Sequence, residues 1–233
     1  MGEKRRLSVE EAAEIALQGA IPKERPADAQ DIRGTYSVVA DAREMRRGVG
    51  TFDDLLELLC SRHVLIMEGR PEKRPGEFKL RQNRAGSTDF VAPDHVVGTL
   101  ERGLTFFAGL TDPFARAVFM LFLVSEVHPF EDGNGRVARV MMNAELVAAE
   151  EHRIIIPTVY RNEYLSGLRA LTHHARPEPL IRVLDFAQRY TAQLDCASLE
   201  QGKAVLTATH AFMDSNEAAD RGVRLTLPSA LER

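Results

Sequence analysis

The stretch HPFEDGNGRVAR, residues 128–139, governs how the rest of this chain has to be arranged. An apolar, helix-forming run, residues 114–127, comes directly before it, and another, residues 137–149, follows it. Backbone polar groups are costly to bury without partners, so a polar loop between two buried helices needs a chemical reason. We predict that the reason is a bound polyphosphate.

The overall composition is that of an ordinary globular protein, with 233 residues, 44% hydrophobic and 27% charged. The net charge of −4 argues against a dedicated nucleic-acid binder. The basic start, residues 1–6, is not followed by an apolar signal segment, and the longest apolar run, residues 117–124, is too short to span a bilayer. Cys60 and Cys196 have no metal-binding spacing and indicate reduced thiols. We therefore expect a cytoplasmic protein without nucleic-acid or membrane partners.

Helical signals cover most of the chain, so we predict an all-α fold. Ser8 and Glu11 match a capping box for a short helix that stops near Gly19, and Thr51 and Asp112 match the N-caps of two later helices. Beyond the helices that begin after these caps, the pattern predicts helices over 31–47, 94–109, 137–149, 162–174 and 179–197, and a possible helix after residue 203.

Residues 69–93 break the helical pattern with prolines and glycines. Alternating residues at 78–81 and 88–91, separated by a turn at 84–87, predict a single β-hairpin. Such a hairpin is marginal alone and leans on helices or waits for a partner strand. The basic side chains of residues 70–84 are expected to be solvated.

The residues of the central stretch suit an anion site. Gly133 and Gly135 permit positive φ and close approach of the backbone, and flank Asn134 just before a helix, where N–H groups and the helix dipole favour anions. Arg136 and Arg139 share one face of that helix, and guanidiniums pair bidentately with phosphate.

Two further residues complete the chemistry. One carboxylate, Asp132, together with phosphate oxygens and water is a usual way to hold Mg²⁺. His128 has an ordinary pKa near ~6.5, which suits a general base. An EF-hand is excluded because its sixth and twelfth positions are Val137 and Asn143, and a P-loop is excluded because no Gly-Lys-Ser/Thr follows. Each residue alone has a structural explanation; their unbroken order favours function.

The run resembles the signature of the Fic (Fido) family, His-Pro-Phe-x-Asp/Glu-Gly-Asn-Gly-Arg-x-x-Arg, at every specified position. The segment 75–78 and the hairpin look like the family's approach to its flap, and the continuation 139–143 and the helix of Tyr164 are also similar. The resemblance implies an all-α core with a β-hairpin flap. It divides the chain into an N-terminal helix and linker, 1–30, a catalytic domain, 31–197, and a C-terminal extension, 198–233.

The resemblance also implies an activity, the transfer of AMP from ATP to a Ser, Thr or Tyr hydroxyl of a protein docked on the flap. By position, His128 is the base and Asp132 holds Mg²⁺. The phosphates are bound by Gly133, Asn134, Gly135, Arg136 and Arg139. Gly135 favours nucleotidyl transfer, because the kinase-like branch of the family carries Lys there.

The family's inhibitory Ser/Thr-x-x-x-Glu-Gly/Asn segment has no clear counterpart. Val64 stands at the Ser/Thr position before Glu68-Gly69, and in the stretch 32–34 the Glu position is Arg33. We therefore expect Arg139 to be free unless another carboxylate or an inhibitory partner in trans restrains it. Two alternatives stay open: an ATP-binding regulatory module without transfer, and hydrolytic removal of AMP. The target protein, the nucleotide donor and the oligomeric state are not determined by the residues.

Overall fold

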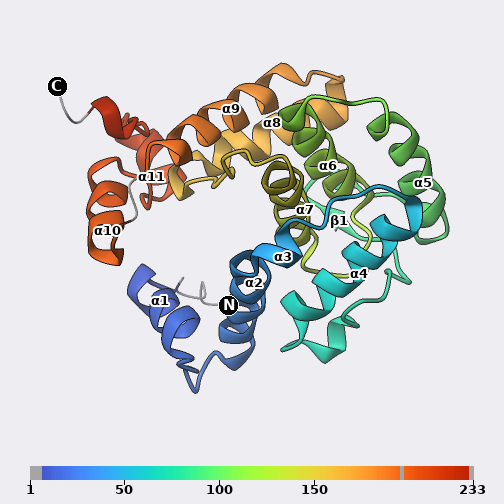
Figure 1. Ribbon diagram of the computed structural model, residues 1–233, viewed down its shortest axis with the longest axis horizontal. Helices are drawn as coiled ribbons and strands as arrows, with labels where there is room; N and C mark the ends of the chain where they lie inside the picture. Colours follow the sequence, from blue (N-terminus) through green and yellow to red (C-terminus); the bar gives the residue numbers. More distant parts are fainter. Residues whose placement is uncertain (1–6, 195–196, 231–233) are drawn as a thin grey trace. The chain divides into compact units, whose positions relative to one another are not determined.

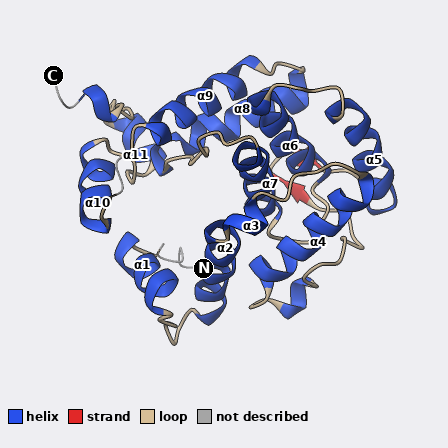
Figure 2. Cartoon of the chain, in the orientation of Figure 1, coloured by secondary structure: helices blue, strands red, loops and turns tan. Residues whose placement is uncertain are grey.

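The computed structural model describes residues 7–194 and 197–230, which leaves Cys196 outside the described residues. These residues form helices and one small antiparallel hairpin, as Figures 1 and 2 show, which confirms the all-α prediction. None of the described helices is long and apolar enough to cross a membrane. The elements, with 3₁₀ helices labelled η, are α1 (Val9–Gln18), α2 (Pro26–Ala40), α3 (Ala42–Met45), α4 (Phe52–Met67), η1 (Pro71–Lys73), β1 (Arg84–Ala85), β2 (Thr88–Asp89), η2 (Pro93–His95), α5 (Val96–Phe107), α6 (Pro113–Val127), α7 (Asn134–Ala148), η3 (Thr158–Tyr160), α8 (Arg161–His174), α9 (Glu178–Ala192), α10 (Leu199–Ala208), α11 (Ser215–Asp220) and η4 (Pro228–Ala230).

The chain divides into two compact units, Met1–Ala149 and Glu150–Arg233. In the first unit α7 is the central helix, because it packs against α2, α3, α4 and α6 (Figure 1). Its apolar side chains are almost wholly buried, among them Val137, Ala138 and Met142. The motif loop, residues 128–133, joins α6 to this helix and so lies at the N-terminus of the most enclosed element of the unit.

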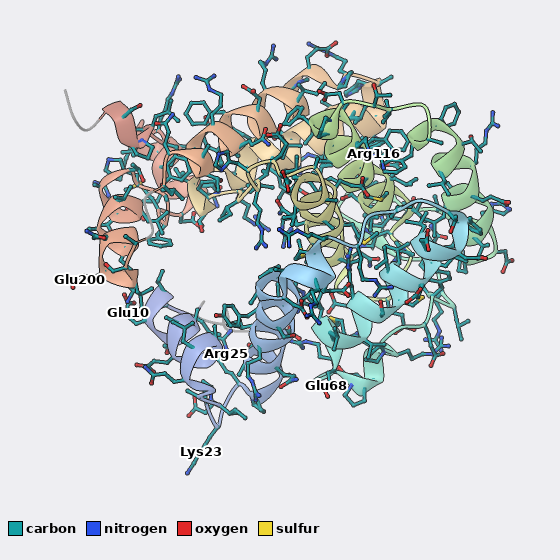
Figure 3. The ribbon with its side chains drawn as sticks, viewed as in Figure 1. Glu10, Lys23, Arg25, Glu68, Arg116 and Glu200 are labelled. Carbon is teal, nitrogen blue, oxygen red and sulfur yellow. The ribbon has the colours of Figure 1, made fainter. Side chains whose placement is uncertain are left out.

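An ion pair between α6 and α7 helps to hold this core together. The Arg116 guanidinium, labelled in Figure 3, lies 2.9 Å from the Glu145 carboxylate, which is 5% exposed. The other carboxylate oxygen of Glu145 accepts a hydrogen bond of 3.1 Å from the backbone N–H of Val49. A buried charge is tolerated only when its hydrogen bonds are satisfied, and here they also tie the loop before α4 to α7.

The second unit has its own core. Helix α8 packs against α9, η3 and α11. A buried cluster in this unit includes Val159, Tyr190 and Leu225, and the Tyr190 hydroxyl lies 2.6 Å from the hydroxyl of Thr209. Tyr164 is buried on α8.

The helix caps expected from the sequence are present. Ser8 and Glu11 form the reciprocal capping box, and Gly19 ends α1 at a φ of 71°. Thr51 and Asp112 each accept a hydrogen bond from the backbone N–H three residues further on. These contacts are local, which is why short sequence patterns predict them.

Two predicted helices have the wrong ends. The helix expected over 31–47 begins at Pro26, whose fixed φ suits the first helical position, and stops at Ala40. Asp41 then accepts hydrogen bonds from two backbone N–H groups and starts the separate short helix α3. The helix expected over 179–197 ends at Ala192.

The predicted hairpin exists, but its first strand is misplaced. Strands β1 and β2 pair with Arg84 opposite Asp89, and Gly86 in the turn has a φ of 59°. Residues 78–81 form no strand because they bond elsewhere: the backbone N–H of Lys79 donates to the carbonyl of Pro129 at 2.8 Å. The segment is thus attached to the motif loop instead of to β2.

The expectation that the basic side chains of residues 70–84 are solvated is wrong for two of them. Lys79 is 2% exposed, and its ammonium donates to the carbonyl of Val127 at 3.1 Å. Burial lowers the pKa of Lys79 to about 8. Arg70 pairs with two carboxylates of α2, Asp28 and Asp31. Both side chains therefore serve as internal anchors.

Candidate functional site

One pocket of about 430 Å³ at the N-terminus of α7 collects every residue that the motif singled out. Residues from the hairpin segment and one more loop residue, none of them predicted, complete its wall. The lining residues are Asn83, Arg84, His128, Glu131, Asp132, Gly133, Asn134, Gly135, Arg136 and Arg139.

His128 is held in one orientation and one tautomer. It follows the last residue of α6 in a left-handed conformation, with φ 51°, and its N–H donates to the carbonyl of Val124. Its ring Nδ1 lies 3.2 Å from the carbonyl oxygen of Ser125. A carbonyl only accepts, so Nδ1 carries the proton and Nε2 keeps its lone pair. No group in the described part of the chain bonds Nε2, which leaves it able to accept a proton.

The environment of His128 keeps it neutral. Burial is the main cause that lowers the pKa of His128 to about 4, and the charge of Lys79 acts in the same direction. The Phe90 ring, from the segment after β2, stacks on the imidazole with centroids 3.7 Å apart and planes within 4°. At neutral pH the imidazole is therefore an uncharged base covered on one face.

The motif loop is closed by its own asparagine. The backbone N–H of Phe130 donates to Asn134 Oδ1, and Asn134 Nδ2 donates to the carbonyl of Phe130, both at 2.8 Å. Asn134 is 1% exposed, so its side chain is used up in this pair of bonds. What Asn134 can offer a ligand is its backbone N–H.

A second histidine, His63 on α4, fastens the loop from behind. Its ring stacks on Phe130 with centroids 3.7 Å apart and planes within 4°. The N–H of Gly76 donates to Nδ1 at 2.8 Å, so the proton resides on Nε2, which lies 3.0 Å from the carbonyl of Asp132. Burial lowers the pKa of His63 to about 4. Phe130 is wholly buried and acts as an apolar anchor of the loop.

The two glycines of the motif have different roles. Gly133 has a φ of 76°, and a Cβ atom there would lie 2.7 Å from the sulfur of Met67. Gly135 lies inside α7, and a Cβ there would meet only the Arg139 guanidinium, at 3.4 Å. The expected left-handed conformation is thus used at Gly133 alone, while Gly135 keeps the pocket open.

The first turn of α7 presents backbone N–H groups and guanidiniums to the pocket. The N–H groups of Asn134 and Gly135 have no partner within residues 7–194 and 197–230, as befits the start of a helix. Arg139 pairs with no carboxylate in that part of the chain, while Arg136 Nη1 lies 2.7 Å from Asp31. Oriented N–H groups and two guanidiniums at one pocket suit a ligand with several negative charges.

Neither of the two positions that were compared with the family's inhibitory glutamate pairs with Arg139 in the described residues. Glu68, labelled in Figure 3, accepts a hydrogen bond of 2.5 Å from Gln30, and Arg33 is exposed on α2. No carboxylate of the described residues is bonded to Arg139.

Asp132 lines the pocket beside the first turn of α7. One oxygen of Asp132 accepts the N–H of Gly133 at 2.7 Å, which orients the group and leaves the second oxygen for another ligand. The described residues contain no group of three or more His, Cys, Asp or Glu that would hold a metal alone. The residues fit Mg²⁺ only if phosphate oxygens supply the other ligands.

Sequence patterns missed the residues that support the loop from outside. Asn83 Nδ2 donates to the carbonyl of Phe130 at 2.9 Å, and Lys79 donates to Asn83 Oδ1 at 2.8 Å. His63 was read only as one of the apolar positions of α4. Its contact with the loop joins residues 69 positions apart, so no local pattern could show it.

Residues 51–146, which include the pocket from α4 to α7, match the sequence model of the Fic/DOC family. That part of the chain is similar to a Fic domain. Protein adenylyltransferase fic-1 of Caenorhabditis elegans is 30% identical over 122 residues, 51% of this chain and 23% of that protein. Protein adenylyltransferase Fic of Drosophila yakuba is 27% identical over 192 residues, 78% of this chain and 36% of that protein.

Among solved structures, residues 134–508 of Fic-1 from C. elegans superpose with a TM-score of 0.65, at 21% identity. The match covers 87% of this chain and 59% of that one, and shows a shared fold. The curated relatives are much longer than this protein, which spans about a quarter to a third of their length.

Proposed function

We propose that this Fic domain transfers AMP from ATP to a serine, threonine or tyrosine hydroxyl of a target protein. The observation that carries the proposal is the neutral imidazole of His128, with an unbonded Nε2, in the same pocket as the anion-binding start of α7. The names of the adenylyltransferase relatives support the same reaction class.

In the proposed reaction the target hydroxyl oxygen attacks the α-phosphorus of ATP. His128 Nε2 takes the hydroxyl proton, the new oxygen–phosphorus bond forms, and the bond to the β-phosphate oxygen breaks, so that pyrophosphate leaves. A base that is already neutral at pH 7 needs no prior deprotonation. With a pKa of about 4 its proton affinity is modest, so the attack is driven mainly by positioning and charge neutralisation.

The rest of the pocket would handle the triphosphate. The N–H groups of Asn134 and Gly135, with Arg136 and Arg139, would bind its oxygens. Mg²⁺ held by Asp132 and the phosphates would offset the charge that builds up on the leaving group. These residue roles come from the motif and agree with the geometry of the pocket.

The hairpin is the proposed docking place of the target. Phe90 covers one face of His128, and Asn83 and Arg84 border the pocket. Strands β1 and β2 are short and mostly exposed, which leaves main-chain groups near the base for an extended segment. The hydroxyl to be modified would then be delivered beside Nε2 by backbone pairing.

The test is labelling of protein by ATP carrying the label on its α-phosphate, with Mg²⁺ present. Wild type should label itself or a target without removal of any partner, because no carboxylate in residues 7–194 and 197–230 pairs with Arg139. His128→Ala should reduce labelling by about a hundred- to ten-thousandfold, the usual contribution of a general base. ATP labelled on the γ-phosphate should transfer nothing, since that label leaves with pyrophosphate.

Three outcomes contradict the proposal. Equal labelling by wild type and His128→Ala would show that His128 is not the general base. Transfer of the γ-label indicates phosphorylation. Tight ATP binding in a calorimeter, with no transfer to any protein of a lysate, indicates a regulatory binding module.

A further inference from the structure

We propose that Asp31, on α2, is a positioning residue that holds the Arg136 guanidinium at the wall of the pocket. The carboxylate of Asp31 lies 2.7 Å from Arg136 Nη1, from the first turn of α7. The two side chains are 14% and 23% exposed, so the pair is largely shielded from solvent. The nucleotide as ligand is taken from the proposed function, whereas the contact itself does not depend on it.

The Asp31 carboxylate is itself fixed by a second guanidinium. Arg70 Nε lies 3.1 and 2.9 Å from its two oxygens, and Arg70 Nη2 lies 2.8 Å from one of them. Forked contacts of this kind restrict the rotation of a carboxylate. Asp31 therefore presents one orientation to Arg136.

The helix that carries Asp31 is also fixed. A Cβ atom on Gly34 of α2 would lie 2.0 Å from the carbonyl oxygen of Leu65 on α4, so the two helices touch backbone to backbone. The sulfur of Met67, at the end of α4, lies 3.1 Å from Arg136 Nη2. Arg136 is thus held by side chains of α2 and α4, and the direct backbone contact between these two helices keeps them from shifting independently.

The ion pair with Asp31 does not cancel the positive charge that attracts phosphate to Arg136. Asp31 shares its carboxylate between the Arg136 and Arg70 guanidiniums, so one negative charge faces two positive ones. Arg70 also pairs with Asp28, which in turn pairs with Arg25 (labelled in Figure 3). Asp31 therefore orients Arg136 without removing its attraction for a polyphosphate.

The two motif arginines therefore differ in how firmly each is held before a ligand binds. Arg139 has no carboxylate partner in the described residues, so a ligand must immobilise it. Arg136 is already immobilised through Asp31, and fixing a long side chain before binding spares that entropy when the ligand arrives. Without Asp31, Arg136 becomes as costly to order as Arg139.

The test compares two carboxylates of one helix. Asp31→Ala should weaken MgATP binding, measured by calorimetry, by about three- to tenfold. The matched control is Asp28→Ala, which loses bonds to Arg70 and Arg25 but touches neither motif arginine, and should change binding by less than about twofold. In an Arg136→Ala background, Asp31→Ala should have no further effect.

A second measurement does not require nucleotide. Nitrogen-15 relaxation of Arg136 Nε should show a rigid side chain in wild type and Asp28→Ala, and a mobile one in Asp31→Ala. Wild type that binds ATP but transfers no AMP defeats the proposed function and leaves this proposal standing. If wild type binds no nucleotide, relaxation alone decides whether Asp31 positions Arg136.

Two results overturn the proposal. Unchanged or tighter ATP binding by Asp31→Ala shows that the carboxylate is neutral or competes with phosphate. An equally rigid Arg136 without Asp31 shows that the helices hold the guanidinium unaided. Should Asp31→Ala fail to fold, Asp31→Asn keeps the size and one acceptor oxygen and is judged by the same comparison.

Discussion

The motif loop has two sides, one facing α4 and one facing the pocket, and each is built around a histidine stacked on a phenylalanine. His63 on Phe130 and Phe90 on His128 have the same centroid distance, 3.7 Å, and the same interplanar angle, 4°. Desolvation lowers the pKa of both histidines to about 4, although His63 is wholly buried and His128 is only partly buried. By stacking and pKa the two sides cannot be told apart.

What separates the two sides is hydrogen bonding. Both ring nitrogens of His63 are bonded to backbone, from Gly76 and Asp132, whereas His128 bonds backbone through Nδ1 alone. A base needs an available lone pair, and only His128 has one. A perturbed pKa therefore identifies a buried histidine, and the unbonded nitrogen identifies the candidate base.

The largest expected effects come from removing each histidine in turn. His128→Ala should lose the labelling activity described above and change the free energy of unfolding little. His63→Ala leaves the N–H of Gly76 and the carbonyl of Asp132 without their partners at a part-buried position and removes the ring stacked on Phe130, which should cost about 3 kcal/mol. Urea unfolding and initial labelling rates measure the two quantities.

The distinction between the two sides fails if His63→Ala is as stable as wild type. His63→Gln serves as the matched control, because it keeps one donor and one acceptor and should recover part of the lost stability. A His128→Ala protein that is equally destabilised would show that His128 also holds the loop.

The glycines provide a smaller test. Gly133→Ala has to adopt a φ of 76° and meets the Met67 sulfur, so it should lose about 1–2 kcal/mol for the backbone strain alone. Gly135→Ala adds a methyl group on the pocket side, in ordinary contact with Arg139, and should change stability by less than about 0.5 kcal/mol. It should instead weaken ATP binding.

Urea unfolding midpoints measure the stability of Gly133→Ala and Gly135→Ala, and ATP titrations measure their affinity for the nucleotide. Equal loss of stability at both positions would contradict the assignment of Gly133 to the α4 side and Gly135 to the pocket side.

The smallest expected effect is that of mild acid on the rate. With a pKa of about 4, His128 stays neutral from pH 7 to about pH 5, so kcat/KM should be flat there and fall only nearer pH 4. A fall centred near pH 6.5, the ordinary value for histidine, would show that His128 is not desolvated in solution.

Stability should respond to the same acid range with a definite sign. Both histidines have folded pKa values below the unfolded value, so between about pH 4 and 6.5 the unfolded chain binds more protons. Their contribution is fully present above pH 6.5 and is lost progressively as the pH falls toward 4. His63→Gln should reduce this loss, because one of the two titrating groups is gone.

The sequence predicted the pocket better than it predicted the supports around it. The motif residues lie within twelve consecutive positions, so their shared location at the start of α7 follows from one short loop and one helix. The hairpin was predicted, but its first strand was placed at 78–81 instead of at Arg84–Ala85. The alternation along 78–81 does not show that Lys79 bonds Pro129. The N-terminus of α2 was missed because Pro26 was taken as a linker residue.

Caps, the helix order and the candidate base follow from neighbours along the chain, since the interactions that define them span only a few residues. The cover over that base, the outer support of the loop and the contrast between Arg136 and Arg139 depend on residues distant in the sequence: Phe90, His63, Asn83 and Asp31. Those contacts join segments brought together by packing, and their energies become favourable only once the helices are in place. No local pattern carries that information.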